Sequence, residues 1–257
     1  DSSTSRGLGD VYKRQIFLAG MFSVIPLTAV AYGTYGSLTY NTYDSDGDGV
    51  YDYLTIASCA QPVTEVEIPA EIDGVPVTEI QQYAFGGCNN LKNVIIPDRV
   101  VKIGKYAFYD CRSLKEITIP ESVASIDNCA FKNCSVLETV LIKNPECEIY
   151  DSADTIFNNL IFDEETGEDF NSINGIIYGY ENSTAQAYVE KYGYNFKLFV
   201  QGDISKNDLI DLYDAIEVVK YIMKIRTFTE TDKQFADFTG NDAVDLYDAI
   251  EIARTLI

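Results

Sequence analysis

Residues 80–142 repeat one pattern with a period of 23 residues. The dipeptide Ala-Phe recurs at 84–85, 107–108 and 130–131, and five further columns of apolar residues or cysteine keep the same spacing. Each unit reads I-x-x-x-A-F-x-x-C-x-x-L-x-x-(V/I)-x-I. A unit of this length cannot bury its own apolar face, so successive units stack and share a continuous core. The period therefore predicts a solenoid.

Each unit contains one short segment with alternating apolar residues, which is typical of a strand with one buried face. The Ala-Phe pair is expected on the opposite, more helical side of the solenoid. Stacked units would place like residues in columns about 4.8 Å apart. The three expected strands are residues 94–96, 117–119 and 140–142.

This repeat resembles the BspA-like leucine-rich repeat of bacterial surface and secreted proteins. The resemblance covers about residues 36–196 and implies a solenoid with a cap at each end. Residues 38–76, an irregular strand-rich segment, are interpreted as the N-terminal cap. At the other end, residues 183–186 have the pattern of a capping box and predict a helix. Together with Gly193 and Phe196, this helix resembles the closing element of the family.

Six cysteines occur, and three of them, Cys88, Cys111 and Cys134, occupy one repeat column. In that column the expected role is a buried, small apolar side chain. An even number of cysteines in an exported chain also permits disulfides, so pairing among the other three stays open. The sequence contains no CxxC pair, which argues against a metal cluster.

Composition excludes several functions. The chain has 40 acidic and 19 basic residues, a formal charge of −21 and no histidine. Histidine-based catalytic relays and zinc sites are therefore excluded, and the negative charge disfavours binding to nucleic acid. Glu116, Glu121 and Glu138 are expected at solvent-facing positions, which does not favour the paired carboxylates of a glycoside hydrolase. The chain is predicted not to be an enzyme.

Residues 16–31 form an apolar run that follows a Lys-Arg pair and ends in Ala-Val-Ala. This pattern is typical of a signal peptide cleaved after Ala31, and the run is short for a membrane span. Residues 1–15 resemble translated adapter sequence and are interpreted as non-native. The mature chain is therefore expected to be secreted and to have no membrane span after signal cleavage.

Asp44, Asp46 and Asp48, followed by Asp52, place carboxylates as in the first half of a calcium loop. The twelfth position of that loop is Thr55, which cannot supply the closing bidentate carboxylate. A weak calcium site and a hairpin turn stabilised by Asp and Gly are the two interpretations.

Two twelve-residue segments, 203–214 and 237–248, carry oxygen-bearing side chains at positions 1, 3, 5, 9 and 12. Alternate positions of a tight loop converge on one point, and calcium takes six to eight oxygen ligands. An acidic helix cap is the alternative, but two copies in register favour the metal. The expected ligands are Asp203, Ser205, Asn207, Asp211 and Asp214 in the first loop and Asp237, Thr239, Asn241, Asp245 and Asp248 in the second, with the carbonyls of Leu209 and Ala243 at position 7.

The duplicated loop and helix resemble a type I dockerin module over about residues 200–257. The resemblance implies two Ca²⁺ ions that help to order a small helical domain, and docking onto a cohesin module of a scaffoldin. Three features depart from the usual calcium loop. Position 12 is Asp rather than Glu, position 6 is Asp208 or Asp242 rather than Gly, and the pattern shows no helix before either loop.

The segment Asp-Leu-Tyr-Asp-Ala-Ile-Glu is identical at 211–217 and 245–251. Calcium binding alone does not demand identical Leu-Tyr pairs, and an apolar-aromatic anchor beside a basic residue is typical of an interface hot spot. Either copy could then meet the same partner, in two orientations about 180° apart. The other interpretation places the leucines in the core of the module. By the resemblance, the cohesin-binding residues are Leu212, Tyr213, Lys220, Leu246, Tyr247 and Arg254.

The predicted fold class is an α+β solenoid of leucine-rich repeats with short strands, followed by a small all-α calcium-binding domain. The predicted domains are 1–31, the non-native start and signal peptide; 32–198, the repeats with their caps; and 199–257, the dockerin. The predicted function is that of a non-catalytic, secreted cellulosome component whose repeats bind a protein, cell-surface or polysaccharide target. The alternatives are a calcium-dependent surface adhesin without a scaffoldin and an accessory polysaccharide-degrading enzyme.

Overall fold

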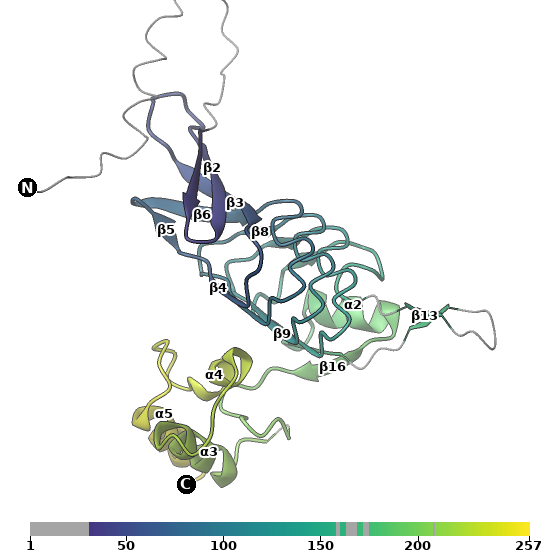
Figure 1. The fold of residues 1–257 in the computed structure, drawn as a ribbon. Coiled ribbons are helices and arrows are strands. Elements are labelled where there is room, and N and C mark those ends of the chain that lie inside the picture. Colours follow the sequence, from purple (N-terminus) through teal and green to yellow (C-terminus); the bar gives the residue numbers. More distant parts are fainter. Residues whose placement is uncertain (1–30, 158–159, 163–168, 172–174, 208) are drawn as a thin grey trace, which may run out of the picture.

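The computed structural model describes residues 31–157, 160–162, 169–171, 175–207 and 209–257. The expected signal segment lies outside the described residues, apart from Ala31, which begins the first strand. Within the described residues, the chain forms a β-solenoid followed by a small helical domain, as the sequence predicts (Figure 1).

The first solenoid sheet begins with an antiparallel meander and continues as parallel strands, in the order β1-β2-β3-β6-β8-β10-β12. The parallel part has one strand from each successive repeat, so it grows along the solenoid axis. Its strands are β1 (Ala31–Tyr35), β2 (Leu38–Tyr43), β3 (Tyr53–Cys59), β6 (Val75–Ile80), β8 (Lys102–Ile103), β10 (Ser125–Ile126) and β12 (Glu148–Ile149), with β5 (Glu71–Ile72) paired to β6.

The second face of the solenoid holds the strands that the sequence predicts, each within one residue of its expected position. One parallel sheet has the order β16-β15-β11-β9, and β4 pairs with β7 beside it. Side chains alternate between the solenoid core and the outer face of this sheet. The strands are β4 (Glu65–Glu67), β7 (Asn93–Ile95), β9 (Glu116–Ile119), β11 (Thr139–Ile142), β15 (Ile176–Gly179) and β16 (Asn195–Leu198); β13 (Leu160–Phe162) and β14 (Asp169–Asn171) form a separate pair.

The side that carries the Ala-Phe pairs consists of tight turns, whereas the sequence predicts a more helical conformation. Two positions in each repeat take the left-handed backbone conformation, which ends a right-handed turn before it can extend into a helix. Backbone hydrogen bonds, such as Phe85 N to Ala107 O (2.7 Å), join neighbouring repeats. The left-handed residues are Tyr83, Tyr106 and Cys129 at the first position and Gly87, Asp110 and Asn133 at the second.

The repeat phenylalanines form one stack through the core. The ring centroids of Phe85 and Phe108 lie 4.9 Å apart and those of Phe108 and Phe131 lie 5.1 Å apart, with the rings nearly parallel. All three side chains are fully buried. Their spacing matches the distance between adjacent strands, so the ring stack and the sheets share one repeat distance.

The cysteine column is buried, as expected. The thiol of Cys111 donates a hydrogen bond to the Phe85 carbonyl of the preceding repeat (3.2 Å), and Cys134 makes the same contact one repeat later. The half-buried thiol of Cys59 instead donates to the Ser37 hydroxyl (3.8 Å) and the Ala60 carbonyl (3.7 Å). All six cysteines are free thiols. The column therefore satisfies buried carbonyls as well as filling space.

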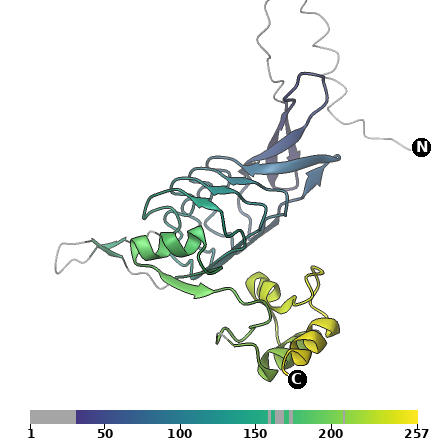
Figure 2. The same cartoon turned by 180° about the vertical axis from the view of Figure 1, so that it is seen from behind.

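Helix α2 (Thr184–Tyr192) lies across the end of the solenoid, as predicted (Figure 2). Ser183 is its N-cap and accepts a hydrogen bond from Gln186 N (3.2 Å), and Gly193 ends it with a φ of 73°. The Gln186 side chain accepts from Asn182 N rather than from the N-cap residue. The second hydrogen bond of the capping box is therefore made to the residue before the N-cap.

The described part of the C-terminal domain holds three helices, in which α3 and α5 pack together and α4 lies next to β9 (Figure 1). Four residues, 199–202, separate β16 from the first candidate calcium loop. Among the described residues, none of the helices combines the length and apolarity that crossing a membrane requires. The helices are α3 (Leu212–Ile222), α4 (Glu230–Ala236) and α5 (Leu246–Arg254).

Candidate calcium loops and docking face

The first candidate calcium loop is folded around two buried aspartates. Asp203 is 2% exposed and Asp214 is fully buried. Asp214 accepts hydrogen bonds from Ser205 N on one carboxylate oxygen and from Asp211 N on the other, both at 2.8 Å. Asp203 accepts from Asn207 N at 3.1 Å. Backbone N–H groups therefore fix the carboxylates of positions 1 and 12 against the loop.

The second loop repeats these hydrogen bonds 34 residues later. Asp248 is fully buried and accepts from Thr239 N (2.9 Å) and Asp245 N (2.8 Å), while Asp237 accepts from Asn241 N (3.0 Å). The two loops differ at five of their twelve positions and keep oxygen-bearing side chains at positions 1, 3, 5, 9 and 12. The two loops thus share one pattern of hydrogen bonds.

The donor atoms of both loops fit calcium, a hard ion that prefers oxygen ligands. A carboxylate that accepts one N–H on each oxygen keeps further lone pairs for a metal. Among the described residues, neither Asp214 nor Asp248 takes part in an ion pair. A buried carboxylate without a cation is costly, and a bound calcium ion would offset that cost at each loop.

The sequence pattern shows no helix before either loop, and this expectation is wrong for the second loop. Helix α4 ends at Ala236, directly before Asp237. Seven residues are too few for a helical period to be read from the sequence. The helix begins with a capping box between Thr229 and Asp232, and the fully buried ring of Phe235 anchors it.

The identical segments after the loops place the same residues at the surface. Leu212 and Tyr213 are 59% and 71% exposed, and Leu246 and Tyr247 are 58% and 69% exposed. The leucines therefore do not face the core of the module, which was the alternative interpretation. We call these two pairs the α3 patch (Leu212 and Tyr213) and the α5 patch (Leu246 and Tyr247).

The two basic candidates, Lys220 and Arg254, each pair with a glutamate of their own helix. Lys220 Nζ lies 2.8 Å from an oxygen of Glu217, and Arg254 contacts Glu251. Glu217 has a second partner, Arg226, and the hydrogen bond from Lys220 followed by that from Arg226 lowers the pKa of Glu217. The two copies are thus matched in their apolar patches and differ in the charge around them.

The N-terminal acidic turn brings three of its four candidate ligands together. Carboxylate oxygens of Asp44, Asp46 and Asp48 lie within 4.8 Å of one another. Asp52 instead accepts hydrogen bonds from the hydroxyl and the N–H of Ser45, which lower its pKa. Asp44 accepts from two glycine N–H groups of the same turn. These bonds are typical of an Asp-Gly hairpin turn, and the weak calcium site stays a prediction.

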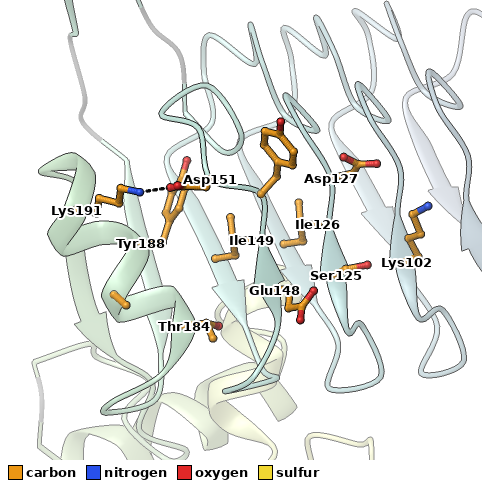
Figure 3. A pocket seen from close by; sticks show the side chains of 12 residues that line it. Lys102, Ser125, Ile126, Asp127, Glu148, Ile149, Asp151, Thr184, Tyr188 and Lys191 are labelled. Carbon is orange, nitrogen blue, oxygen red and sulfur yellow. Dashed lines mark hydrogen bonds and ion pairs between the residues drawn. The ribbon is translucent and has the colours of Figure 1, made fainter.

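A groove with a volume of about 590 Å³ lies between α2 and the strands β8, β10 and β12. Figure 3 shows Tyr188 and Lys191 of α2 facing the strands that carry Ile126 and Ile149. Lys191 forms an ion pair with Asp151 at one side of the groove. The groove thus combines apolar and charged side chains.

The outer residues of the groove were missed by sequence reasoning. Lys102, Ser125 and Glu148 follow the 23-residue spacing of the repeat, so the sequence contains their alignment. It does not contain the position of α2, which forms the facing side. Tyr150, which is 48% exposed, and Asp127 complete the polar side of the groove.

Glu116 is not solvent-facing, contrary to expectation, whereas Glu121 and Glu138 are exposed as predicted. One oxygen of Glu116 accepts a hydrogen bond from Thr231 N of α4 (3.5 Å), and its side chain also bonds to Thr229. Burial raises the pKa of Glu116, and the two hydrogen bonds offset part of that rise. The sequence could not place α4 on this part of the solenoid.

Comparison with protein families identifies both parts of the chain. Residues 57–174 match the BspA type leucine rich repeat region in six copies, and residues 201–257 match the dockerin type I domain. Both are non-catalytic interaction modules, and type I dockerin domains bind calcium. The sequence alone reveals only three clear repeats.

Several solved structures are similar to part of the chain. A leucine-rich repeat protein from Bacteroides capillosus is 25% identical with a TM-score of 0.43, covering 49% of this chain and 91% of that chain. The leucine-rich repeat protein of T. pallidum is 19% identical with a TM-score of 0.36, covering 68% of this chain and 98% of that chain. Comparison with curated proteins yields no match.

Proposed function

We propose that this protein is a non-catalytic component of a cellulosome-type assembly. The chain carries a BspA-type leucine-rich-repeat region followed by a type I dockerin domain. The dockerin would bind two calcium ions and a cohesin module of a scaffoldin, while the repeats bind a second target. Dockerin-bearing cellulosome proteins are generally extracellular. We therefore propose that this protein is secreted after cleavage of the expected signal peptide.

The exposed Leu-Tyr patches carry this proposal. Large apolar side chains that stay about 60–70% exposed at matched positions of two packed helices are unusual for a domain without a partner. Helix α4 is covered by the solenoid, and the α3 and α5 patches are not. Aromatic residues beside a cation are enriched among interface hot spots, which supports a protein partner at these patches.

The proposal is tested by calorimetric titration of the chain from residue 32 onward against a panel of cohesins, with calcium and with chelator. We expect binding in the nanomolar range, about −12 kcal/mol, to at least one cohesin, and its loss when calcium is removed, because the ion orders the loops. A calcium-loaded protein that binds no cohesin would instead favour a calcium-dependent adhesin that works without a scaffoldin.

For the repeats, we propose that the groove beside α2 binds a polysaccharide. An exposed tyrosine ring offers an apolar face for a sugar ring. Asp127, Glu148 and Lys102 line the same groove as Tyr150 and offer hydrogen-bonding groups for sugar hydroxyls. A groove of this size, apolar with a few convergent polar groups, is typical of ligand sites.

Affinity electrophoresis in gels that contain soluble xylan or mixed-linkage β-glucan tests the groove. We expect the wild-type chain to be retarded, and Tyr150→Ala to lose at least about tenfold in affinity, or about 1.4 kcal/mol. Tyr35→Ala is the matched control, because Tyr35 is similarly exposed and lies at the other end of the solenoid. Equal retardation of both variants would contradict this site, and no retardation at all would favour a protein or cell-surface target.

A further inference from the structure

The outer face of the second solenoid sheet is covered by the C-terminal domain. Leu141 of β11 is fully buried and Tyr178 of β15 is 5% exposed. Both belong to the apolar cluster of the C-terminal domain and not to the core of the solenoid. The ring of Phe235 in α4 meets that of Tyr178 edge to face, with centroids 5.3 Å apart. The two parts of the chain thus share one packed interface.

The four-residue connection between the two parts, residues 199–202, is also held by packing and backbone hydrogen bonds. Phe199 is buried in the same cluster, and its N–H donates to Gly179 O of β15 (2.7 Å). Gly202 N donates to the carbonyl of Phe235 (2.7 Å). On the solenoid, Lys143 Nζ donates to Gln234 of α4 (3.0 Å). A connection held in this way fixes the domain against the sheet rather than leaving it on a flexible linker.

Lys206 joins the first calcium loop to this interface. It occupies position 4, between the candidate ligands Ser205 and Asn207. Its ammonium group forms an ion pair with Asp232 of α4 (2.8 Å) and lies over the rings of Phe235 (5.3 Å) and Tyr178 (6.0 Å). Its carbonyl accepts a hydrogen bond from Lys197 Nζ of β16 (2.9 Å). One loop residue therefore contacts both the helix and the solenoid sheet.

The second loop shows which residue suits position 4 when that residue makes no contact with the solenoid. Its residue there is Gly240, with a φ of 69°, whereas Lys206 has a φ of 59°. Glycine takes this left-handed conformation without steric cost, and lysine does not. The first loop thus keeps a strained residue at the position where its copy has glycine. The lysine side chain makes contacts across the interface that the glycine of the second loop cannot make.

We propose that calcium binding in the first loop and packing of the C-terminal domain on the outer face of β9, β11 and β15 stabilise each other through Lys206. An ion that fixes Ser205 and Asn207 also fixes the lysine between them. Reciprocally, a docked solenoid holds the loop in its calcium-binding shape, because coupling between two equilibria acts equally in both directions. No such coupling is expected for the second loop, which has glycine at position 4.

Coupling that acts in both directions can be tested from the solenoid side, because that face can be changed without altering a candidate metal ligand. The full chain is titrated with calcium alone, and the two site affinities are resolved by calorimetry. We expect Leu141→Asn to weaken one calcium site by about tenfold, within the usual range of allosteric coupling, and to leave the other unchanged. Hydroxyl-radical footprinting of Tyr178 in the same samples reports whether the domain has left the sheet.

Lys206→Gly completes a double-mutant cycle and copies the residue of the second loop. In that background, Leu141→Asn should no longer change either calcium affinity. Val101→Asn is the matched control, because Val101 is an exposed solenoid residue outside the interface. Unchanged calcium affinities in a Leu141→Asn chain whose Tyr178 has become reactive would overturn the coupling. A wild-type chain that binds no calcium would contradict the calcium binding of the proposed function as well as the coupling. The failure of the coupling alone can therefore be distinguished from the failure of the proposed function.

Discussion

Replacing both docking patches with alanine is expected to abolish cohesin binding, whereas replacing either patch alone changes the affinity by only about twofold. Each patch offers the same leucine and tyrosine at nearly the same exposure. If either can meet the partner, the loss of one removes half of the binding orientations, which costs about 0.4 kcal/mol. The loss of both removes the hot spot itself, and hot-spot truncations cost about 2 kcal/mol or more per residue. Calorimetric titration with calcium measures all three variants.

Tyr32→Ala and Ile225→Ala are the controls for these variants, since both remove exposed apolar side chains outside the two patches. They should leave the affinity unchanged. A loss of more than about tenfold, or 1.4 kcal/mol, from one patch alone would show that a single orientation is used. The extra charge of Arg226 beside Glu217 in the first copy would then be the first feature to test as its cause.

The repeat columns were sufficient to predict the solenoid. Their spacing gives the length of the repeat, and their apolar residues indicate which face of each repeat is buried. Phe85, Phe108 and Phe131 stack as expected from their spacing. The strands β8, β10 and β12 could not be predicted, since two residues are too few to show alternation. The turns on the Ala-Phe side were also missed, because left-handed backbone at Tyr or Cys has no strong sequence signal.

Part of the candidate sites could also be predicted from the sequence, and part could not. The candidate calcium ligands and the Leu-Tyr pairs lie close together in sequence and occur twice, so their pattern was visible. The interface between solenoid and dockerin was not, because Leu141, Tyr178 and Phe235 come from segments far apart in the chain. Glu116 illustrates the consequence: its position in the repeat predicts exposure, and only the docked α4 makes it half-buried with a raised pKa.

Asp214→Asn is expected to remove one of the two proposed calcium ions and to destabilise the dockerin. The fully buried carboxylate supplies position 12 and also accepts the N–H groups of Ser205 and Asp211. An amide has one oxygen, so it removes both the charge that binds calcium and one of these acceptors. At free calcium of about 100 times the dissociation constant, loss of the ion alone lowers the unfolding free energy by about 2.7 kcal/mol. Calcium stoichiometry and urea unfolding measure the two effects.

Urea unfolding in the presence of a chelator separates the contribution of calcium to stability from that of helix capping. Without calcium, Asp214→Asn should cost only about 1 kcal/mol, the usual value of a helix-capping hydrogen bond, because Asp214 is the N3 residue of a capping box whose N-cap is Asp211. The remainder of the loss should appear only when calcium is present. Asp242→Asn is the control, because Asp242 is exposed and is not a candidate ligand. An equal loss with and without calcium would mean that Asp214 only caps α3. The duplicated loops would then be structural turns, and the α3 and α5 patches would need no metal to hold them.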